Sequence, residues 1–230
     1  MFRLSAAFVS PYQSLVALRC LITAGPTREF LDPVRFLSNP STGKMGFALA
    51  EAARDLGMTV DLVAGPVSLP EPRGVMLYPV VTAEQMYHQV DGLFGPCDLF
   101  LSVAAVSDWR PKVRHAQKVR REAGAPALEL EPCPDILRAM VARRRAGQVV
   151  VGFAAETGDL EVGARAKLAS KGVDFLAAND VGGPAGAFGS ETNRILLLGA
   201  AGSRHLLGPA SKAEVARALL AAVLPSLAPR

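Results

Sequence analysis

Short apolar runs with the composition of β-strands alternate along this chain with amphipathic segments of helical periodicity. The strand-like runs are "LVALRCLITA", "MTVDLVAG", "VMLYPV", "DLFLSVAA", "QVVVGFAA", "VDFLAAND" and, near the C-terminus, "RILLLG". Helices are expected after Ser41, over 83–93, 135–145 and 162–171, and from Ser211. Such alternation is typical of parallel β-α-β units covered on both faces. The sequence therefore predicts an α/β fold with a doubly wound, mostly parallel, Rossmann-like sheet.

One segment interrupts this alternation. Residues 109–132, "WRPKVRHAQKVRREAGAPALELEP", are charged, contain Pro and Gly, and end in the alternating pattern "ALELE". This composition predicts a flap with a short hairpin rather than a crossover helix. The expected organisation is a loose leader over residues 1–14 and a single domain over 15–230, with the flap at about 109–132.

Composition excludes several classes of function. The 230 residues are half apolar, which is typical of a folded globular protein. The net charge of +4 comes without a basic block or interleaved aromatic residues, so nucleic-acid binding is not expected. No apolar run approaches the roughly 20 residues that cross a bilayer, so no membrane partner is expected. Three widely spaced cysteines without a C-x-x-C pair indicate neither disulfides nor zinc, and fit a cytoplasmic protein.

Polar residues gather in the loops that follow the predicted parallel strands. These loops are "GPTREFLDPVRFLSNPSTGKMG", "SVAAVSDWRP", "GFAAETGD" and "ANDVGGPAGAFGSETN". Ligands of open α/β sheets bind beyond the carboxyl ends of the strands, so all four loops are expected at one edge. The first loop, about 17 residues long, carries Arg28, Asp32 and Arg35. Its two arginines suit a phosphate or carboxylate, and the alternative is a surface ion pair of Arg28 with Glu29 or Asp32.

The stretch "SNPSTGKMG", residues 38–46, resembles a phosphate-binding P-loop only superficially. Ser38 stands where that pattern needs its first glycine, and Met45 stands where it needs a magnesium-binding hydroxyl. What survives is a helix start that Ser41 or Thr42 caps, and helix starts attract anions.

Several single residues allow two interpretations. Asp108 follows a strand and suits either an Mg²⁺-nucleotide or a simple turn cap. Lys167 and Lys171 share a helix face, which usually indicates a solvated stripe. Lys118 belongs to the basic run "KVRR" and suits either a bound polyphosphate or solvent. The three histidines form no Ser-His-acid or metal-ligand pattern, so positioning and electrostatic stabilisation are expected rather than covalent catalysis.

Seven linked motifs carry a family resemblance. "ITAGPTREFLDPVRFLSNPSTGKMG", "AAVSDWRP", "KVRR", "PDIL", "VGFAAET", "AKLASKGVDFLAAND" and "FGSETNRILLL" occur in order over roughly residues 15 to 225. Together they closely resemble bacterial phosphopantothenate-cysteine ligase. The resemblance implies that the carboxylate of 4'-phosphopantothenate attacks CTP, with Mg²⁺ as the cation, and that L-cysteine then displaces CMP. It also implies a homodimer, and a separate flavin-dependent decarboxylase for the following step.

The resemblance also assigns residues. Asn39 would contact the acyl carbonyl of the acyl-cytidylate, the Ser41 helix start would receive phosphate, and Lys118 would act from the flap in the second half-reaction. Asp108 would also hold the metal. Positions that match nucleotide contacts in the family are Ser102, Val103, Ala104, Asp108, Lys118, Cys133, Pro134, Asp135, Ile136, Phe153, Lys167 and Lys171.

Three positions depart from the family pattern. Pro40 replaces a polar residue, "KVRR" keeps only its first lysine, and Cys133 replaces the Asn of "NPDIL". Two rival functions remain open. A nicotinamide-dependent oxidoreductase predicts G-x-G-x-x-G after the first strand, where this chain has "AGPTREF". A non-catalytic nucleotide-binding domain would have no need of Asn39 and Lys118.

Overall fold

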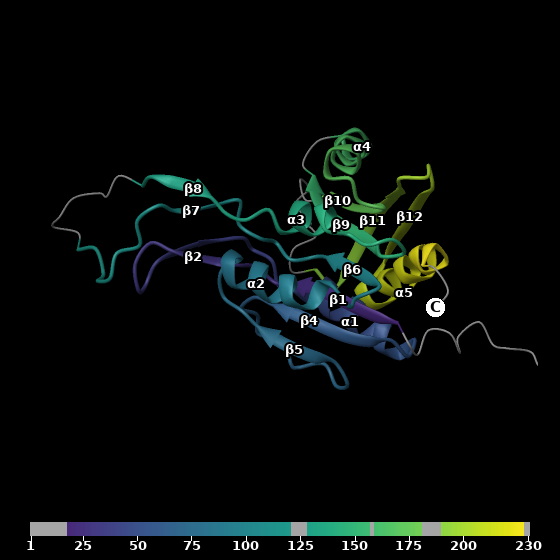
Figure 1. Cartoon of the computed structure of the whole chain (residues 1–230), viewed down its shortest axis with the longest axis horizontal. Coiled ribbons are helices and arrows are strands. Elements are labelled where there is room, and N and C mark those ends of the chain that lie inside the picture. The colour runs from purple at the N-terminus through teal and green to yellow at the C-terminus, as the bar shows by residue number, and fades with distance from the viewer. Residues whose placement is uncertain (1–17, 121–127, 157–158, 181–189, 228–230) are drawn as a thin grey trace, which may run out of the picture.

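An eight-stranded sheet forms the centre of the molecule (Figure 1). A computed structural model describes residues 18–120, 128–156, 159–180 and 190–227; the expected leader, residues 1–14, lies outside them. From one edge to the other the strands are β12 (Arg204–Ser211), β11 (Thr192–Gly199), β10 (Phe175–Asp180), β9 (Val149–Glu156), β6 (Leu99–Ser102), β1 (Arg19–Ala24), β4 (Thr59–Ala64) and β5 (Met76–Pro79). Strand order reverses beside β1, where the two halves of the sheet diverge.

The sheet is mostly parallel, which confirms the predicted fold class. β5, β4, β1, β6, β9 and β10 pair in parallel, whereas β11 and β12 are antiparallel to their neighbours. β12 was not predicted, because its sequence "RHLLGPAS" lies at the sheet edge with mostly exposed residues and lacks an apolar run.

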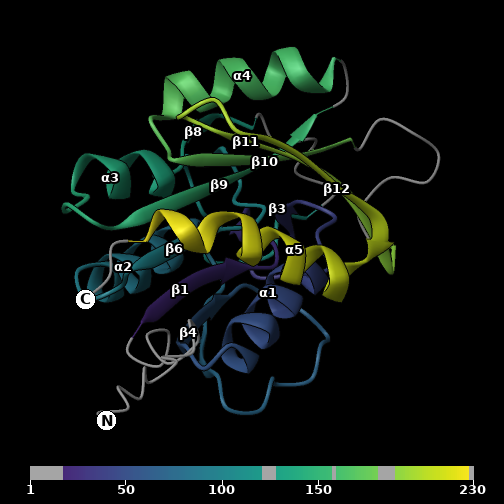
Figure 2. The same ribbon diagram turned by 90° about the vertical axis from the view of Figure 1, so that its right-hand side faces the viewer.

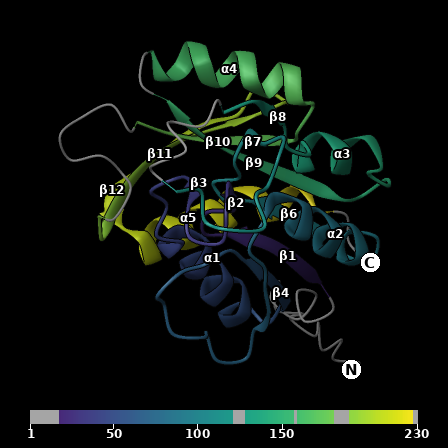
Figure 3. The same ribbon diagram turned by 90° about the vertical axis from the view of Figure 1, so that its left-hand side faces the viewer.

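Helices cover both faces of the sheet, as the sequence predicts. α1 (Lys44–Asp55) and α5 (Lys212–Val223) pack together over one face (Figure 2). α2 (Ala83–Phe94), α3 (Ile136–Ala142) and α4 (Leu160–Lys171) cover the other face (Figure 3). Capping boxes at Thr82 and Ser211 begin α2 and α5. Among the described helices, none has the length and apolar character needed to cross a membrane.

The start of α1 differs from the prediction that Ser41 or Thr42 caps it. The N-cap is Gly43, which adopts a left-handed conformation with φ of 77° and makes no side-chain cap. Ser41 Oγ instead accepts a hydrogen bond from the Gly43 N–H at 3.4 Å. A Cβ on Gly46 would lie 2.5 Å from that of Ala24, so glycine lets the first turn of α1 approach β1 closely.

Two small hairpins project from the body of the molecule (Figure 1). One pairs β2 (Arg28–Phe30) with β3 (Phe36–Ser38), inside what the sequence showed only as a long loop. The other pairs β7 (Trp109–Pro111) with β8 (Leu130–Pro132), which confirms the hairpin predicted in the flap. We call these two hairpins together the arm: residues 28–38, 109–120 and 128–132. Arg121 of "KVRR" lies outside the described residues.

Candidate functional site

A cavity of about 730 Å³ opens at the carboxyl ends of the parallel strands. Thirteen of the fourteen residues that the sequence nominated line it: Asn39, Ser41, Ser102, Val103, Ala104, Asp108, Cys133, Pro134, Asp135, Ile136, Phe153, Lys167 and Lys171. Described residues from all four loops that the strand-end rule placed at one edge therefore do meet there. Gly25, Asn179, Asn193 and Lys212 also line the cavity, and sequence reasoning had not nominated them.

Asn39 is held at the cavity wall by its own side chain. It follows β3, and its Nδ2 donates a hydrogen bond to the Ala105 carbonyl at 3.0 Å. Ser38, the residue before it, donates from Oγ to the Thr27 carbonyl at 2.7 Å. An amide NH₂ group carries two N–H donors, so one orients the group and the other can serve a ligand.

Two buried threonines shape the loop after β6. Thr23 Oγ1 accepts hydrogen bonds from the backbone N–H groups of Val103 and Ala104, at 3.1 and 3.2 Å. Thr27 Oγ1 accepts one from the Ser107 N–H at 3.0 Å. These N–H groups are thus used inside the protein, and the loop carries Asp108, whose side chain is exposed at the cavity.

Both candidate lysines of α4 form ion pairs at the cavity. Lys167 Nζ lies 2.9 Å from Glu156, and Lys171 Nζ lies 2.7 Å from Asp135. Asp135 also caps α3 by accepting a hydrogen bond from the Arg138 N–H. Partial burial by itself would raise the pKa of Asp135. Hydrogen bonds and nearby positive charges, of which the hydrogen bond from Lys171 is the largest effect, outweigh burial and lower this pKa. The pairs hold the two ammonium groups beside the space where a ligand would lie.

Cys133 stands where the resemblance implies Asn. Its backbone N–H donates to the Asp108 carbonyl at 2.8 Å, a contact that does not depend on the side chain. Burial, followed by the nearby charge of Glu29, raises the pKa of the Cys133 thiol to about 11. The side chain is therefore a neutral thiol at physiological pH, and not a thiolate nucleophile or metal ligand.

The cavity lining includes a basic group that the sequence did not suggest. Lys212 is buried, lines the cavity, and donates from Nζ to the Ser190 carbonyl. Burial, and next the positive charge of Lys44, lowers its pKa. Lys44 itself pairs with Glu191. Lys212 begins α5, beyond the antiparallel strands, so a search of parallel strand ends could not have found it; Asn179, at the end of β10, could have been found that way.

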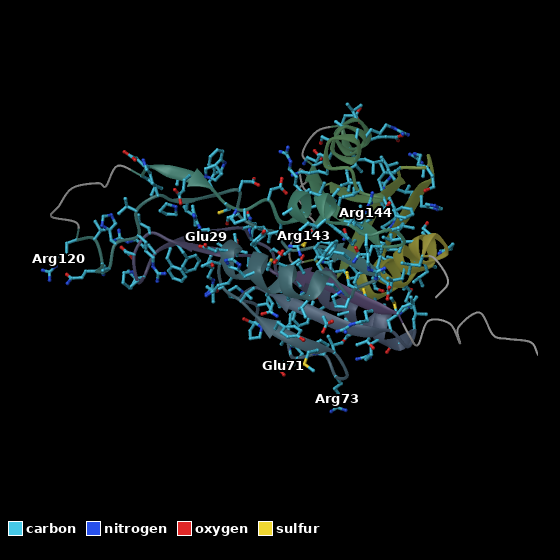
Figure 4. The ribbon with its side chains drawn as sticks, in the orientation of Figure 1. Glu29, Glu71, Arg73, Arg120, Arg143 and Arg144 are labelled. Atoms are coloured by element: carbon cyan, nitrogen blue, oxygen red, sulfur yellow. The ribbon has the colours of Figure 1, made fainter. Side chains whose placement is uncertain are left out.

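Lys118 is the nominated residue that does not line the cavity. It is exposed on the arm, and Figure 4 shows Arg120 at the far end of that arm. Arg28 and Arg35 do not line the cavity either. Arg28, for which an ion pair with Glu29 or Asp32 was the alternative, lies over the Phe36 ring at 4.7 Å, and Asp32 pairs with Arg35 instead.

No group of three or more His, Cys, Asp or Glu side chains suited to a metal lies within the described part of the chain. Asp108 and Asp135 are carboxylates that line the cavity, and Asp135 pairs with Lys171. This matches Mg²⁺ in nucleotide sites, which takes one or two carboxylates, substrate phosphates and water rather than an all-protein cage.

Comparison with known proteins supplies the family context. The model described as DNA/pantothenate metabolism flavoprotein C-terminal domain matches residues 15–226. The coenzyme A biosynthesis bifunctional protein CoaBC of Bacillus subtilis is 44% identical over 201 residues, which cover 87% of this chain and 49% of the relative. The Escherichia coli protein of that name is 40% identical over 220 residues, covering 94% and 54%. The chain thus spans about half the length of the curated relatives it matches.

Solved structures share the fold. The crystal structure of a CoaBC C-terminal domain has a TM-score of 0.77 and 37% identity, and the match covers 91% of this chain and 95% of that one. A Cab2 variant in complex with phosphopantothenate-cysteine has a TM-score of 0.75 over 93% of this chain and 87% of its own, at 19% identity. At that identity the likeness to Cab2 concerns the fold alone.

Proposed function

The chain belongs to the family described as the DNA/pantothenate metabolism flavoprotein C-terminal domain, and from this premise we propose that it is a phosphopantothenate-cysteine ligase of coenzyme A biosynthesis. The observation that carries the proposal is that thirteen nominated residues, from every nominated segment except that of the flap lysine, line one cavity. No G-x-G-x-x-G follows β1, which disfavours a nicotinamide-dependent oxidoreductase.

In the first half-reaction, a carboxylate oxygen of 4'-phosphopantothenate attacks the α-phosphorus of CTP. The bond to the pyrophosphate oxygen breaks, and an acyl-cytidylate forms. Lys167 and Lys171 supply positive charge at the cavity wall, and the N-terminus of α1 adds backbone N–H groups. Asp108 is the residue that would hold Mg²⁺, which when bound would neutralise phosphate charge.

In the second half-reaction, the cysteine amine attacks the acyl carbon, the bond to CMP breaks, and the amine loses a proton to solvent. Negative charge develops on the acyl oxygen during the attack. Asn39 suits this charge, because its Nδ2 is oriented by Ala105 and retains a second N–H. Lys118 would add positive charge near the same intermediate.

In this proposal Lys118 acts at the cavity of a second copy of the chain. It lies on the arm, outside the cavity of its own chain. Six of the nine large apolar side chains that are exposed among the described residues belong to the arm: Val34, Phe36, Trp109, Val113, Leu128 and Leu130. An exposed cluster of this kind suits a protein interface. We therefore place the arm in a homodimer, with Lys118 of one subunit acting at the cavity of the other.

The test is direct. The purified protein is incubated with 4'-phosphopantothenate, L-cysteine, Mg²⁺ and either CTP or ATP, and products are identified by mass spectrometry. The proposal expects amide, CMP and pyrophosphate with CTP. Amide formation with ATP alone would keep the ligase but replace the nucleotide. Nucleotide binding without product would favour a non-catalytic nucleotide-binding domain, and a separate flavin-dependent decarboxylase would then have no product to consume.

A further inference from the structure

Asp32, in the loop between β2 and β3, is a buried carboxylate away from the cavity. Its Oδ1 accepts hydrogen bonds from the N–H groups of Val34 and Arg35, each at 2.9 Å. Its Oδ2 accepts from Arg35 Nε at 2.9 Å and from the Val119 N–H at 3.2 Å. Of these contacts, the last reaches out of the hairpin to a residue 87 positions later, next to Lys118.

Arg35 completes this attachment. Its guanidinium pairs with Asp32 at 2.7 Å and also donates to the Val119 carbonyl. Asp32 thus accepts from the N–H of Val119, and Arg35 donates to the carbonyl of the same residue. We call the Asp32–Arg35–Val119 contact the clamp. The flap meets the hairpin again at His115, whose N–H donates to the Leu31 carbonyl at 2.9 Å. Lys118 lies between these two attachment points.

The same hairpin leads to the other candidate catalytic residue. β3 ends at Ser38, and Asn39 follows it into the cavity wall, where it donates to Ala105. One small element therefore fixes Asn39 at one end and the backbone beside Lys118 at the other.

We propose that Asp32 is a positioning residue: through Arg35 and Val119 it holds Lys118 in the place that the second half-reaction requires. This inference rests on the role given to Lys118 under the proposed function. Burial opposes ionisation of Asp32, but the hydrogen bonds from Val34, Val119 and Arg35 outweigh burial and lower its pKa to about 2. The clamp is consequently charged at every pH at which the protein would be assayed.

The variant Asp32→Asn tests the inference, because an amide nitrogen cannot accept the hydrogen bonds of one carboxylate oxygen. We expect amide formation to slow by roughly tenfold or more, as for loss of an oriented charged group, with pyrophosphate release near the wild-type rate. Hydrogen–deuterium exchange of the Val119 amide should quicken by about tenfold or more. Glu129→Gln is the matched control, since it removes the Lys112 ion pair on the same flap and should change neither readout.

A double-mutant cycle separates positioning from an independent role. If Asp32 acts through Lys118, then D32N in a Lys118→Gln background should form amide no more slowly than Lys118→Gln alone. If the rate losses of the two single variants multiply in the double variant, Asp32 acts independently of Lys118 and the inference is overturned. Should Asp32→Asn fail to fold by its thermal transition, Arg35→Lys serves the same cycle, because lysine keeps the charge but cannot donate to both partners in this geometry.

The inference and the proposed function fail in different ways. Amide formation at the wild-type rate by Lys118→Gln would remove Lys118 from the mechanism. The clamp would then have no catalytic residue to position, and the inference would fail. Slow amide formation by Lys118→Gln together with wild-type Val119 exchange and wild-type turnover in Asp32→Asn would leave the ligase proposal intact and overturn the clamp alone.

Discussion

The cavity and the arm are built in opposite ways. The cavity lies at one edge of a sheet whose core residues, such as Leu101 on β6 and Leu197 on β11, are fully buried. The buried side chains of Thr23 and Thr27 accept hydrogen bonds from the backbone of the loop after β6 and so fix that loop. The arm consists of hairpins with three-residue strands, exposes most of its large apolar side chains, and is tied together at one buried carboxylate, Asp32.

This difference separates two sources of precision. In the cavity, the sheet fixes where backbone groups lie, so small residues such as Ala104 suffice and a single replacement such as Cys133 leaves the loop in place. In the arm, a few side-chain contacts supply the geometry, together with a second copy of the chain in the homodimer that we propose. We therefore expect substitutions in the cavity to alter chemistry directly, and substitutions in the arm to act through position and assembly.

The sharpest test of the cavity is Asn39→Asp. A carboxylate has no N–H to give the developing acyl oxyanion, and it would face the Ala105 carbonyl at the place where Nδ2 now donates. Amide formation should fall by about 10²- to 10³-fold, the usual cost of losing one such donor. Rapid-quench measurement of pyrophosphate and amide in the same sample supplies the internal control, because pyrophosphate release should continue. Normal steady-state turnover would remove Asn39 from the mechanism.

Mixed dimers test whether the arm acts across subunits. Lys118→Gln alone should accumulate acyl-cytidylate, and Lys112→Gln on the same flap should not. Chains carrying Asn39→Asp and Lys118→Gln, given different tags and purified as the mixed dimer, should recover about half the wild-type activity, because a twofold dimer then contains one intact site. If Lys118 acts within its own chain, each site carries one lesion and activity stays near that of the parent variants.

The sheet and the cavity could largely be predicted from the sequence, whereas the β2–β3 hairpin of the arm could not. The alternation of strands and helices specified a parallel sheet covered on both faces, and the family resemblance nominated the thirteen residues that line one cavity. The strand-end rule placed the four polar loops at one edge of that sheet. Such positions follow from local periodicity plus the uniform direction of parallel strands. The hairpin β2–β3 did not show, because three-residue strands such as "REF" and "FLS" are too short to display an alternating pattern.

Long-range pairing was also out of reach. The bonds from Val119 to Asp32 and from Asn39 to Ala105 join residues 87 and 66 positions apart, and no local pattern encodes them. Lys212 belongs to the same class, since only the antiparallel turn of β11 and β12 brings the start of α5 to the cavity. The helix cap at Gly43 was missed because hydroxyl residues beside it gave the stronger local signal.

A smaller effect is expected when the apolar face of the arm is disturbed. Leu130 on β8 is 44% exposed, and Leu130→Asp would place a carboxylate in the proposed interface. The dimer dissociation constant, measured by sedimentation equilibrium, should rise by about tenfold or more. Met76→Asp is the matched control, because Met76 is equally apolar and 59% exposed but lies on β5, away from the arm. Equal weakening by both variants would contradict an interface at the arm.

The smallest expected effect is on CTP binding by Cys133 variants. These variants test whether the backbone or the side chain of Cys133 recognises the nucleotide. Cys133→Asn restores the family's amide and should tighten CTP binding about two- to tenfold, the range of one net hydrogen bond. Cys133→Ala should bind CTP within about twofold of wild type, because the Cys133 N–H to Asp108 bond preserves the loop and a neutral thiol is only a weak donor. Calorimetric titration measures both. A large loss in the Ala variant would mean that the thiol itself recognises the nucleotide, and that this part of the cavity, like the arm, depends on individual side chains.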